Sequence, residues 1–121
     1  MTAKIYYLSC PYSHPNPDIK ASRHRLVNRI TLEFHKQGKL VYSPLTHNIP
    51  LIELNRKYNS WDDWSHFDLE MLQRCDGLIV LQISGWEQSK GVAEEIAHAK
   101  KINIPIEMIN PKEHLDLILE M

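Results

Sequence analysis

Residues 77–101, GLIVLQISGWEQSKGVAEEIAHAKK, contain the two elements that decide the fold. The first five, GLIVL, form an unbroken apolar run, as expected of a parallel strand buried on both faces of its sheet. After a loop through Gly85 and Trp86, residues 89–101 carry their apolar side chains at helical spacing. A buried strand followed by an amphipathic helix predicts an α/β sheet.

The rest of the chain continues this alternation of strands and helices. Strands are expected at residues 4–9, 40–42 and 104–108, and helices at 18–37, 60–75 and from Pro111 onward. The Pro- and Asn-punctuated segment 45–60 is expected to be irregular, with one helical turn at most. Together these elements predict a single domain over residues 1–121, a doubly wound, flavodoxin- or Rossmann-like sheet of four to five mainly parallel strands.

Composition excludes several classes of function. The 121 residues carry a formal net charge of −1 and are 43% hydrophobic, so neither a nucleic acid nor a membrane is an expected partner. The N-terminus shows no signal-peptide pattern. The two cysteines, Cys10 and Cys75, form no CxxC pair, so we expect no disulfide and a cytoplasmic protein.

Motifs for metals and common cofactors are not found in the sequence. The seven histidines form no HExxH or other ligand-spaced cluster, so no metal is expected. Neither GxGxxG nor GxxxxGK[ST] occurs, which argues against dinucleotide and P-loop sites, and no cofactor is expected. Cys10 has no evident histidine partner for nucleophilic chemistry.

Asp68 lies in a helical stripe that is otherwise apolar. Residues three or four apart are neighbours on a helix, and this stripe contains Trp61, Trp64, Asp68, Met71, Leu72 and Cys75. A buried, unpaired carboxylate is unfavourable, and a raised pKa is the usual relief. Asp68 is therefore either an active-site group or a structural residue that caps the backbone or meets an arginine such as Arg23 or Arg25.

Glu95 is a second carboxylate on the apolar side of a helix. It follows Val92 by three residues and precedes Ala99 by four. Glu94 instead falls on the solvent-exposed side of the helix, with Lys90 and Lys101. Glu95 also lies near the helix N-terminus, where the dipole favours an ionised carboxylate. A purely structural role for Glu95 stays open.

Both carboxylates are expected at one edge of the sheet. Ligands of doubly wound sheets bind beyond the carboxyl ends of the strands, which is where Tyr7 and Ser9 end the first strand. Two carboxylates suit a reaction through an oxocarbenium-like centre, because one can attack the sugar carbon while the other moves a proton.

The sequence resembles the nucleoside 2-deoxyribosyltransferase superfamily, including its 2′-deoxynucleoside 5′-monophosphate N-glycosidase branch. The resemblance rests on residues 4–8 (KIYYL), 68–76 (DLEMLQRCD), 78–81 (LIVL) and, most specifically, 89–99 (SKGVAEEIAHA). Residues 9–14, SCPYSH, also resemble a small bacterial and phage subgroup that begins ACPYSH. No match is found for residues 43–60.

The resemblance implies a role for each matching residue. Glu95 stands at the position of the nucleophile, Asp68 at that of the carboxylate that assists proton transfer to the base, and Tyr7 at that of the phenol that orients the nucleophile. Ser9, Ser89 and Gly91 are expected to bind substrate. The family has Asp or Ser at the position of Ser89, and a hydroxyl beside helix N–H groups favours a phosphate, although Ser89 can equally be only the helix N-cap.

The implied activity is cleavage or base exchange at the N-glycosidic bond of a nucleoside or its 5′-monophosphate, in a homodimer or homotetramer. Two alternatives stay open: a glycohydrolase for another N-ribosyl compound such as NAD, and a non-catalytic nucleotide-binding or sensing module. Ala97 and Ser9-Cys10-Pro11 replace glycines of the family pattern, so the pocket can differ in shape. Trp61, Trp64 and Trp86 are candidates for stacking on a base, although the helical spacing of the first two is more typical of core residues.

Overall fold

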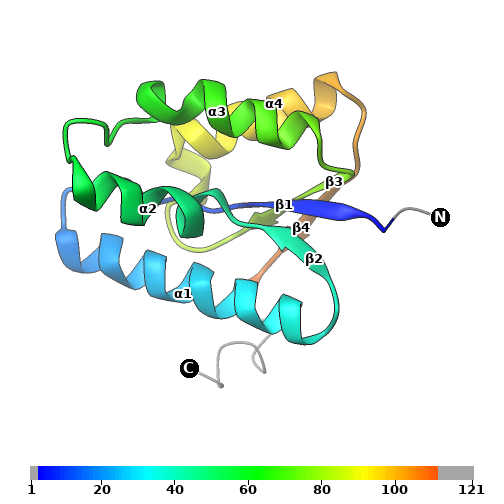
Figure 1. Ribbon diagram of the computed structural model, residues 1–121, viewed down its shortest axis with the longest axis horizontal. Helices are drawn as coiled ribbons and strands as arrows, with labels where there is room; N and C mark the ends of the chain where they lie inside the picture. The colour runs from blue at the N-terminus through cyan, green and yellow to red at the C-terminus, as the bar shows by residue number, and fades with distance from the viewer. Residues whose placement is uncertain (1–2, 112–121) are drawn as a thin grey trace.

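The computed structural model describes residues 3–111, in which a four-stranded parallel sheet lies between two layers of helices (Figure 1). The strands are β1 (Ile5–Ser9), β2 (Leu40–Tyr42), β3 (Gly77–Leu81) and β4 (Ile106–Ile109), and their order across the sheet is β2-β1-β3-β4. The helices are α1 (Pro17–Lys36), α2 (Pro44–Leu54), α3 (Trp61–Gln73) and α4 (Lys90–Lys101), with a 3-10 turn, η1, at Trp86–Gln88. This architecture confirms the predicted doubly wound α/β sheet.

The two faces of β1 belong to different cores. Leu8 packs with Val27 of α1 on one face, and Tyr7 packs with Val92 of α4 on the other. Because strand side chains alternate, Ser9 points to the same face as Tyr7, toward α3 and α4. Figure 1 shows α1 on one side of the sheet and α3 and α4 together on the other.

The centre and one edge of the sheet agree with the sequence pattern. All five residues of β3 are buried, and β3 pairs with β1 on one side and β4 on the other, as predicted for the apolar run. β4 is an edge strand that starts at Ile106, directly after Pro105, instead of at residue 104. The helix predicted from Pro111 onward lies outside the described residues.

The segment expected to be irregular contains a helix instead. Ser43 is the N-cap of α2, its side chain accepts a hydrogen bond from the backbone N–H of Thr46, and Pro44 occupies the first helical position. The prediction of irregular structure was wrong because it rested on the prolines and asparagines of this segment, and a proline is compatible with the first turn of a helix. Pro50 in fact lies inside α2.

The ends of the other helices have the caps that the sequence indicates. Ser60 forms a capping box with Asp63 at the start of α3, and Ser89 caps α4 by accepting from the N–H of Val92. Gly38, with a φ of +80°, follows the end of α1. Within residues 3–111, no helix is long and apolar enough to cross a membrane.

Candidate active site

Glu95 lies at the centre of a buried polar cluster. Its side chain is 4% exposed, and its two carboxylate oxygens accept different bonds: the Tyr7 hydroxyl donates to Oε2, and the Ser9 hydroxyl donates to Oε1 over 2.7 Å. Tyr7 and Ser9 reach one carboxylate because they are two residues apart on a strand and therefore share a face. Glu95 is thus held at both oxygens by β1.

Asp68 is also buried, with 5% of its surface exposed. Its Oδ1 accepts a hydrogen bond of 2.9 Å from the Asn48 side chain of α2. The alternative that Asp68 meets Arg23 is wrong, because the Arg23 guanidinium donates to the backbone carbonyls of Tyr12, Ser13 and Ser84. The hydrogen-bond partner of Asp68 is a neutral amide, so this bond does not neutralise the negative charge of the ionised carboxylate.

A cavity at the carboxyl edge of the sheet brings the two carboxylates together. Its lining includes Asn48, Trp61, Trp64, Asp68, Ser89 and Glu95. The volume is about 90 Å³, below the roughly 300 Å³ of ordinary ligand pockets. A ligand the size of a nucleoside would therefore extend beyond the enclosed space. We call this space the carboxylate cavity.

Burial raises the pKa of both carboxyl groups. The pKa of Glu95 rises to about 8 because the group is removed from water, although the hydrogen bonds from Ser9 and Tyr7 oppose that rise. The pKa of Asp68 rises to about 6 for the same reason, opposed by the Asn48 bond and the nearby His47. Burial and the adjacent Glu95 also raise the pKa of Tyr7 well above its ordinary value, so its phenol stays a donor. Two acids with elevated pKa values on one cavity are typical of catalytic sites.

The residues predicted to bind substrate occupy different places. Ser9 is fully buried and its hydroxyl is engaged by Glu95, so it supports the carboxylate and is not on the cavity wall. Ser89 and Gly91 do line the cavity. Ser89 is also the N-cap of α4, with its oxygen accepting from Val92 N–H over 3.2 Å. The cap and the cavity position therefore coexist in Ser89.

Trp61 and Trp64 line the cavity and are half-buried, so the interpretation of them as core residues is wrong. Trp86 does pack against the core around Tyr7 and is not part of the cavity wall. The indole of Trp61 lies against Gly91, where an added Cβ would approach ring carbon Cε3 to 3.1 Å. A small residue at position 91 thus lets α3 bring Trp61 close to α4.

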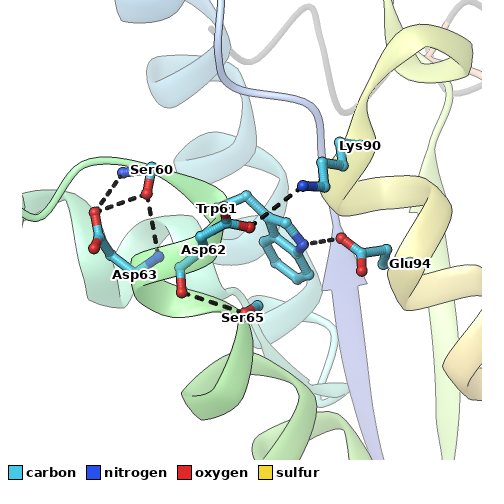
Figure 2. Close-up of polar contacts among 7 residues, drawn as sticks. All are labelled: Ser60, Trp61, Asp62, Asp63, Ser65, Lys90 and Glu94. Carbon is cyan, nitrogen blue, oxygen red and sulfur yellow. Dashed lines mark hydrogen bonds and ion pairs between the residues drawn. The ribbon is translucent and has the colours of Figure 1, made fainter.

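Two polar contacts tie the first turn of α3 to α4. The Trp61 indole N–H donates to the Glu94 carboxylate, and the Lys90 ammonium lies 3.3 Å from Asp62 (Figure 2). Glu94 is exposed, as predicted, but it is bound to a residue of the cavity wall. The sequence pattern contained no signal for this contact, because it joins residues 33 positions apart.

Asn48 and His47 are the site residues that sequence analysis missed. Asn48 is 3% exposed, lines the cavity and binds Asp68. His47 Nδ1 lies 2.7 Å from the Asn48 side-chain oxygen. Both residues come from α2, which was expected to be irregular and had no family match. No signal in the sequence pointed to them, because no helix was expected here and burial cannot be predicted for an irregular segment.

The remaining candidates for chemistry are weaker. Burial raises the pKa of the Cys10 thiol to about 12, so Cys10 is a poor nucleophile, although it borders the cavity. Among residues 3–111, no group of three or more histidine, cysteine, aspartate or glutamate side chains is arranged to hold a metal ion.

The chain is similar to known proteins at two levels, its sequence family and its fold. The family model described as "Domain of unknown function (DUF1937)" matches residues 4–110. No curated protein sequence matches the chain. Among solved structures, the chain is similar to the 2-deoxyribosyltransferase of Bacillus psychrosaccharolyticus, with a TM-score of 0.59 and 16% identity over 88% of this chain and 72% of that one. At this identity the similarity establishes the fold, which is the one that the resemblance predicted.

Proposed function

The chain belongs to the DUF1937 family, and we propose that it cleaves or exchanges the N-glycosidic bond of a deoxynucleoside or of its 5′-monophosphate. The observation that carries this proposal is a pair of buried carboxylates, Glu95 and Asp68, on one cavity. The fold shared with a 2-deoxyribosyltransferase supports the same class of reaction. The protein would therefore act on a small-molecule nucleoside or nucleotide.

Glu95 is the proposed nucleophile. One carboxylate oxygen attacks the anomeric carbon of the sugar and forms an ester bond, while the bond from that carbon to the base nitrogen breaks and its electron pair leaves with the base. The two hydroxyl donors, Tyr7 and Ser9, fix the orientation of the carboxylate during this attack. They also favour the ionised form that the attack requires, because each hydrogen bond lowers the pKa of Glu95.

Asp68 is the proposed acid and base. In its protonated form it gives its proton to the departing base nitrogen. The resulting carboxylate can then take a proton from water or from a second base, which attacks the same sugar carbon and releases Glu95. Water as the acceptor gives hydrolysis, and a second base gives exchange. Near neutral pH the pKa values of about 6 for Asp68 and about 8 for Glu95 place the proton of the pair mainly on Glu95, so the reactive form, with the proton on Asp68, is a minor one.

Ser89 is proposed to face the 5′-phosphate of the substrate. It lies on the cavity wall at the first turn of α4, where backbone N–H groups and the helix dipole favour an anion. An aspartate at this position would repel the phosphate. Nucleotides are therefore the favoured substrates of this proposal, in a homodimer or homotetramer as the family resemblance implies.

A base-release screen tests the proposed function against its two alternatives. The purified protein is incubated with deoxynucleosides, their 5′-monophosphates, the corresponding ribonucleosides and NAD, and free base is measured by chromatography. We expect base release from a deoxynucleoside or its monophosphate. Release of nicotinamide from NAD alone would favour the other glycohydrolase. Saturable binding of a nucleotide without release of any base would favour a sensing module.

A further inference from the structure

Asn48 links the proposed acid to a second helix. Its amide Nδ2 donates to Asp68 Oδ1 over 2.9 Å, and the side chain is buried. Asn48 belongs to α2, a helix whose hydrogen bonding is interrupted at Pro50. The position of α2 therefore decides whether the Asn48 amide reaches Asp68. An amide N–H can donate but cannot accept a proton.

His47 fixes which way the Asn48 amide points. The Asn48 side-chain oxygen can only accept, so His47 Nδ1, 2.7 Å away, must be the donor. The His47 ring in turn stacks on Phe67 of α3, with ring centroids 5.2 Å apart and planes 16° apart. His47 thus holds Asn48 with its Nδ2 toward Asp68, and an exposed imidazole is joined to the buried carboxyl by two hydrogen bonds.

We infer that Asn48, oriented by His47, is a positioning residue that makes Asp68 a directional acid. The inference rests on the proposed function, in which Asp68 protonates the base. Because Oδ1 is occupied by the Asn48 donor, the transferable proton of Asp68 is carried on Oδ2. The acid therefore presents its proton from one defined oxygen instead of alternating between two.

Most of the groups around Asp68 disfavour its ionised form, and the hydrogen bond from Asn48 opposes their effect. Glu95 of α4, Tyr7 of β1 and Tyr42 of β2 interact with Asp68 electrostatically, and His47 of α2 is the nearby cation when it is protonated. The Tyr42 hydroxyl is buried and has no hydrogen-bond partner within residues 3–111. Asn48 is thus the neutral donor that favours the ionised form of Asp68 among groups that mostly disfavour it.

The first test compares two leaving groups in Asn48→Leu. One substrate is 2′-deoxyguanosine or its 5′-monophosphate, whose base needs a proton to leave. The other is the 7-methylated analogue, whose base is already cationic and needs none. We expect kcat to fall roughly tenfold or more for the first substrate and less than about twofold for the second, with KM unchanged for both. An equal loss for both substrates would overturn the inference, because it would indicate general damage to the site.

The second test needs no turnover. Titration of the Asp68 carboxyl carbon by NMR is compared in the wild type, Asn48→Leu and His47→Gln. We expect the pKa of Asp68 to rise in Asn48→Leu, since a bond to the ionised form is lost. In the first test His47→Gln serves as a control, because its side chain keeps a donor for the Asn48 oxygen, and its kcat ratio between the two substrates should stay close to that of the wild type.

The two tests separate the inference from the proposed function. A wild type that releases no base from either substrate contradicts the proposed function, and with it the use of Asp68 as an acid. A wild type that is active, with an unchanged Asp68 titration and unchanged kcat in Asn48→Leu, overturns the role of Asn48 alone. Circular dichroism of each variant shows whether the fold is retained.

Discussion

Glu94 and Glu95 are adjacent in α4, yet their carboxylates accept hydrogen bonds from different elements of the fold. Glu95 points into the protein and accepts from the Tyr7 and Ser9 hydroxyls, whereas Glu94 lies at the surface and accepts from the Trp61 indole (Figure 2). Adjacent positions on a helix point about 100° apart, so the two side chains cannot share one environment. One turn of α4 therefore carries the proposed nucleophile and also holds a wall of its cavity.

Removal of the Glu94 acceptor is expected to weaken substrate binding. In Glu94→Ala, the Trp61 indole N–H loses its partner and the cavity wall becomes less fixed. We expect KM to rise roughly threefold to tenfold while kcat changes less than about twofold, because the loss concerns binding and not the chemical step. Steady-state kinetics on a substrate identified by base release measures both constants.

Two variants control this prediction. Glu94→Gln keeps an oxygen that accepts from the Trp61 indole, so its KM should stay close to that of the wild type. Asp62→Asn weakens the other contact between α3 and α4, the exposed pair with Lys90, without touching the cavity wall. A KM in Glu94→Ala no higher than in Asp62→Asn would show that Glu94 does not act through Trp61.

The pH dependence of kcat/KM should be bell-shaped, with a maximum near pH 7. The active form carries one proton on the carboxyl pair, on Asp68 and not on Glu95. Their pKa values of about 6 and about 8 make the singly protonated pair the main form between these limits. In that pair the proton lies mostly on Glu95, whose pKa is higher, so the active form with the proton on Asp68 is a minor one that has the same pH limits. Below pH 6 the pair is fully protonated and has no nucleophile, and above pH 8 it has no acid.

A substrate with a cationic base distinguishes the two limbs. The 7-methylated deoxynucleoside needs no acid, so its rate should follow the ionisation of Glu95 alone, rising through about pH 8 and not falling above it. A rate that declines equally at high pH for both substrates would contradict the assignment of Asp68 as the acid.

The positions of the proposed catalytic groups could be predicted because regular elements carry them. Glu95 and Asp68 interrupt apolar helical stripes, and the alternation of β1 puts Tyr7 and Ser9 on one face. The parallel sheet followed from the apolar run of β3 for the same reason. Each of these features depends on a period within one element, which a sequence shows directly.

The contacts between elements could not be predicted in the same way. Asn48 meets Asp68, and Trp61 meets Glu94, only after α2 and α4 have packed beside α3. α2 could not be predicted because it is only weakly amphipathic and because Pro50 lies in its interior. The partner of a buried polar group is therefore a property of the tertiary structure, which is also why Arg23 was a wrong candidate for Asp68.

Glu95 should make the protein less stable at high pH. Its pKa is raised from about 4.5 to about 8 on folding, so the folded state holds a proton that the unfolded state has already lost. The stability that this proton provides is complete below about pH 4.5 and is lost as the pH rises through 8. Glu95→Gln has no such proton. The melting temperature of the wild type, relative to this variant, should therefore fall by at least about 4 °C between pH 5 and pH 8.5.

Thermal unfolding followed by circular dichroism measures this difference. Glu94→Gln, which removes an exposed carboxylate from the same helical turn, is the control and should follow the wild type at both pH values. If the gap between Glu95→Gln and the wild type were independent of pH, the carboxyl of Glu95 would not be the buried acid described above.

The preference for a 5′-phosphate should depend on the charge at position 89. Ser89→Asp is a sharper test than Ser89→Ala, because aspartate also caps a helix and so preserves the start of α4. The added negative charge should lower kcat/KM for the monophosphate roughly tenfold or more, and should change kcat/KM for the free nucleoside little. Kinetics on the two substrates gives this ratio. An equal effect on both would place the phosphate elsewhere.

The most direct test of the central claim is the rate of base release by Glu95→Gln, compared with the wild type on the same substrate. The glutamine keeps the size of the side chain and an oxygen that accepts from Ser9 or Tyr7, but it cannot carry the attacking charge. We predict a fall in turnover of roughly 10³-fold or more, with binding of the substrate retained. Turnover in Glu95→Gln within about tenfold of the wild type would contradict the assignment of Glu95 as the nucleophile.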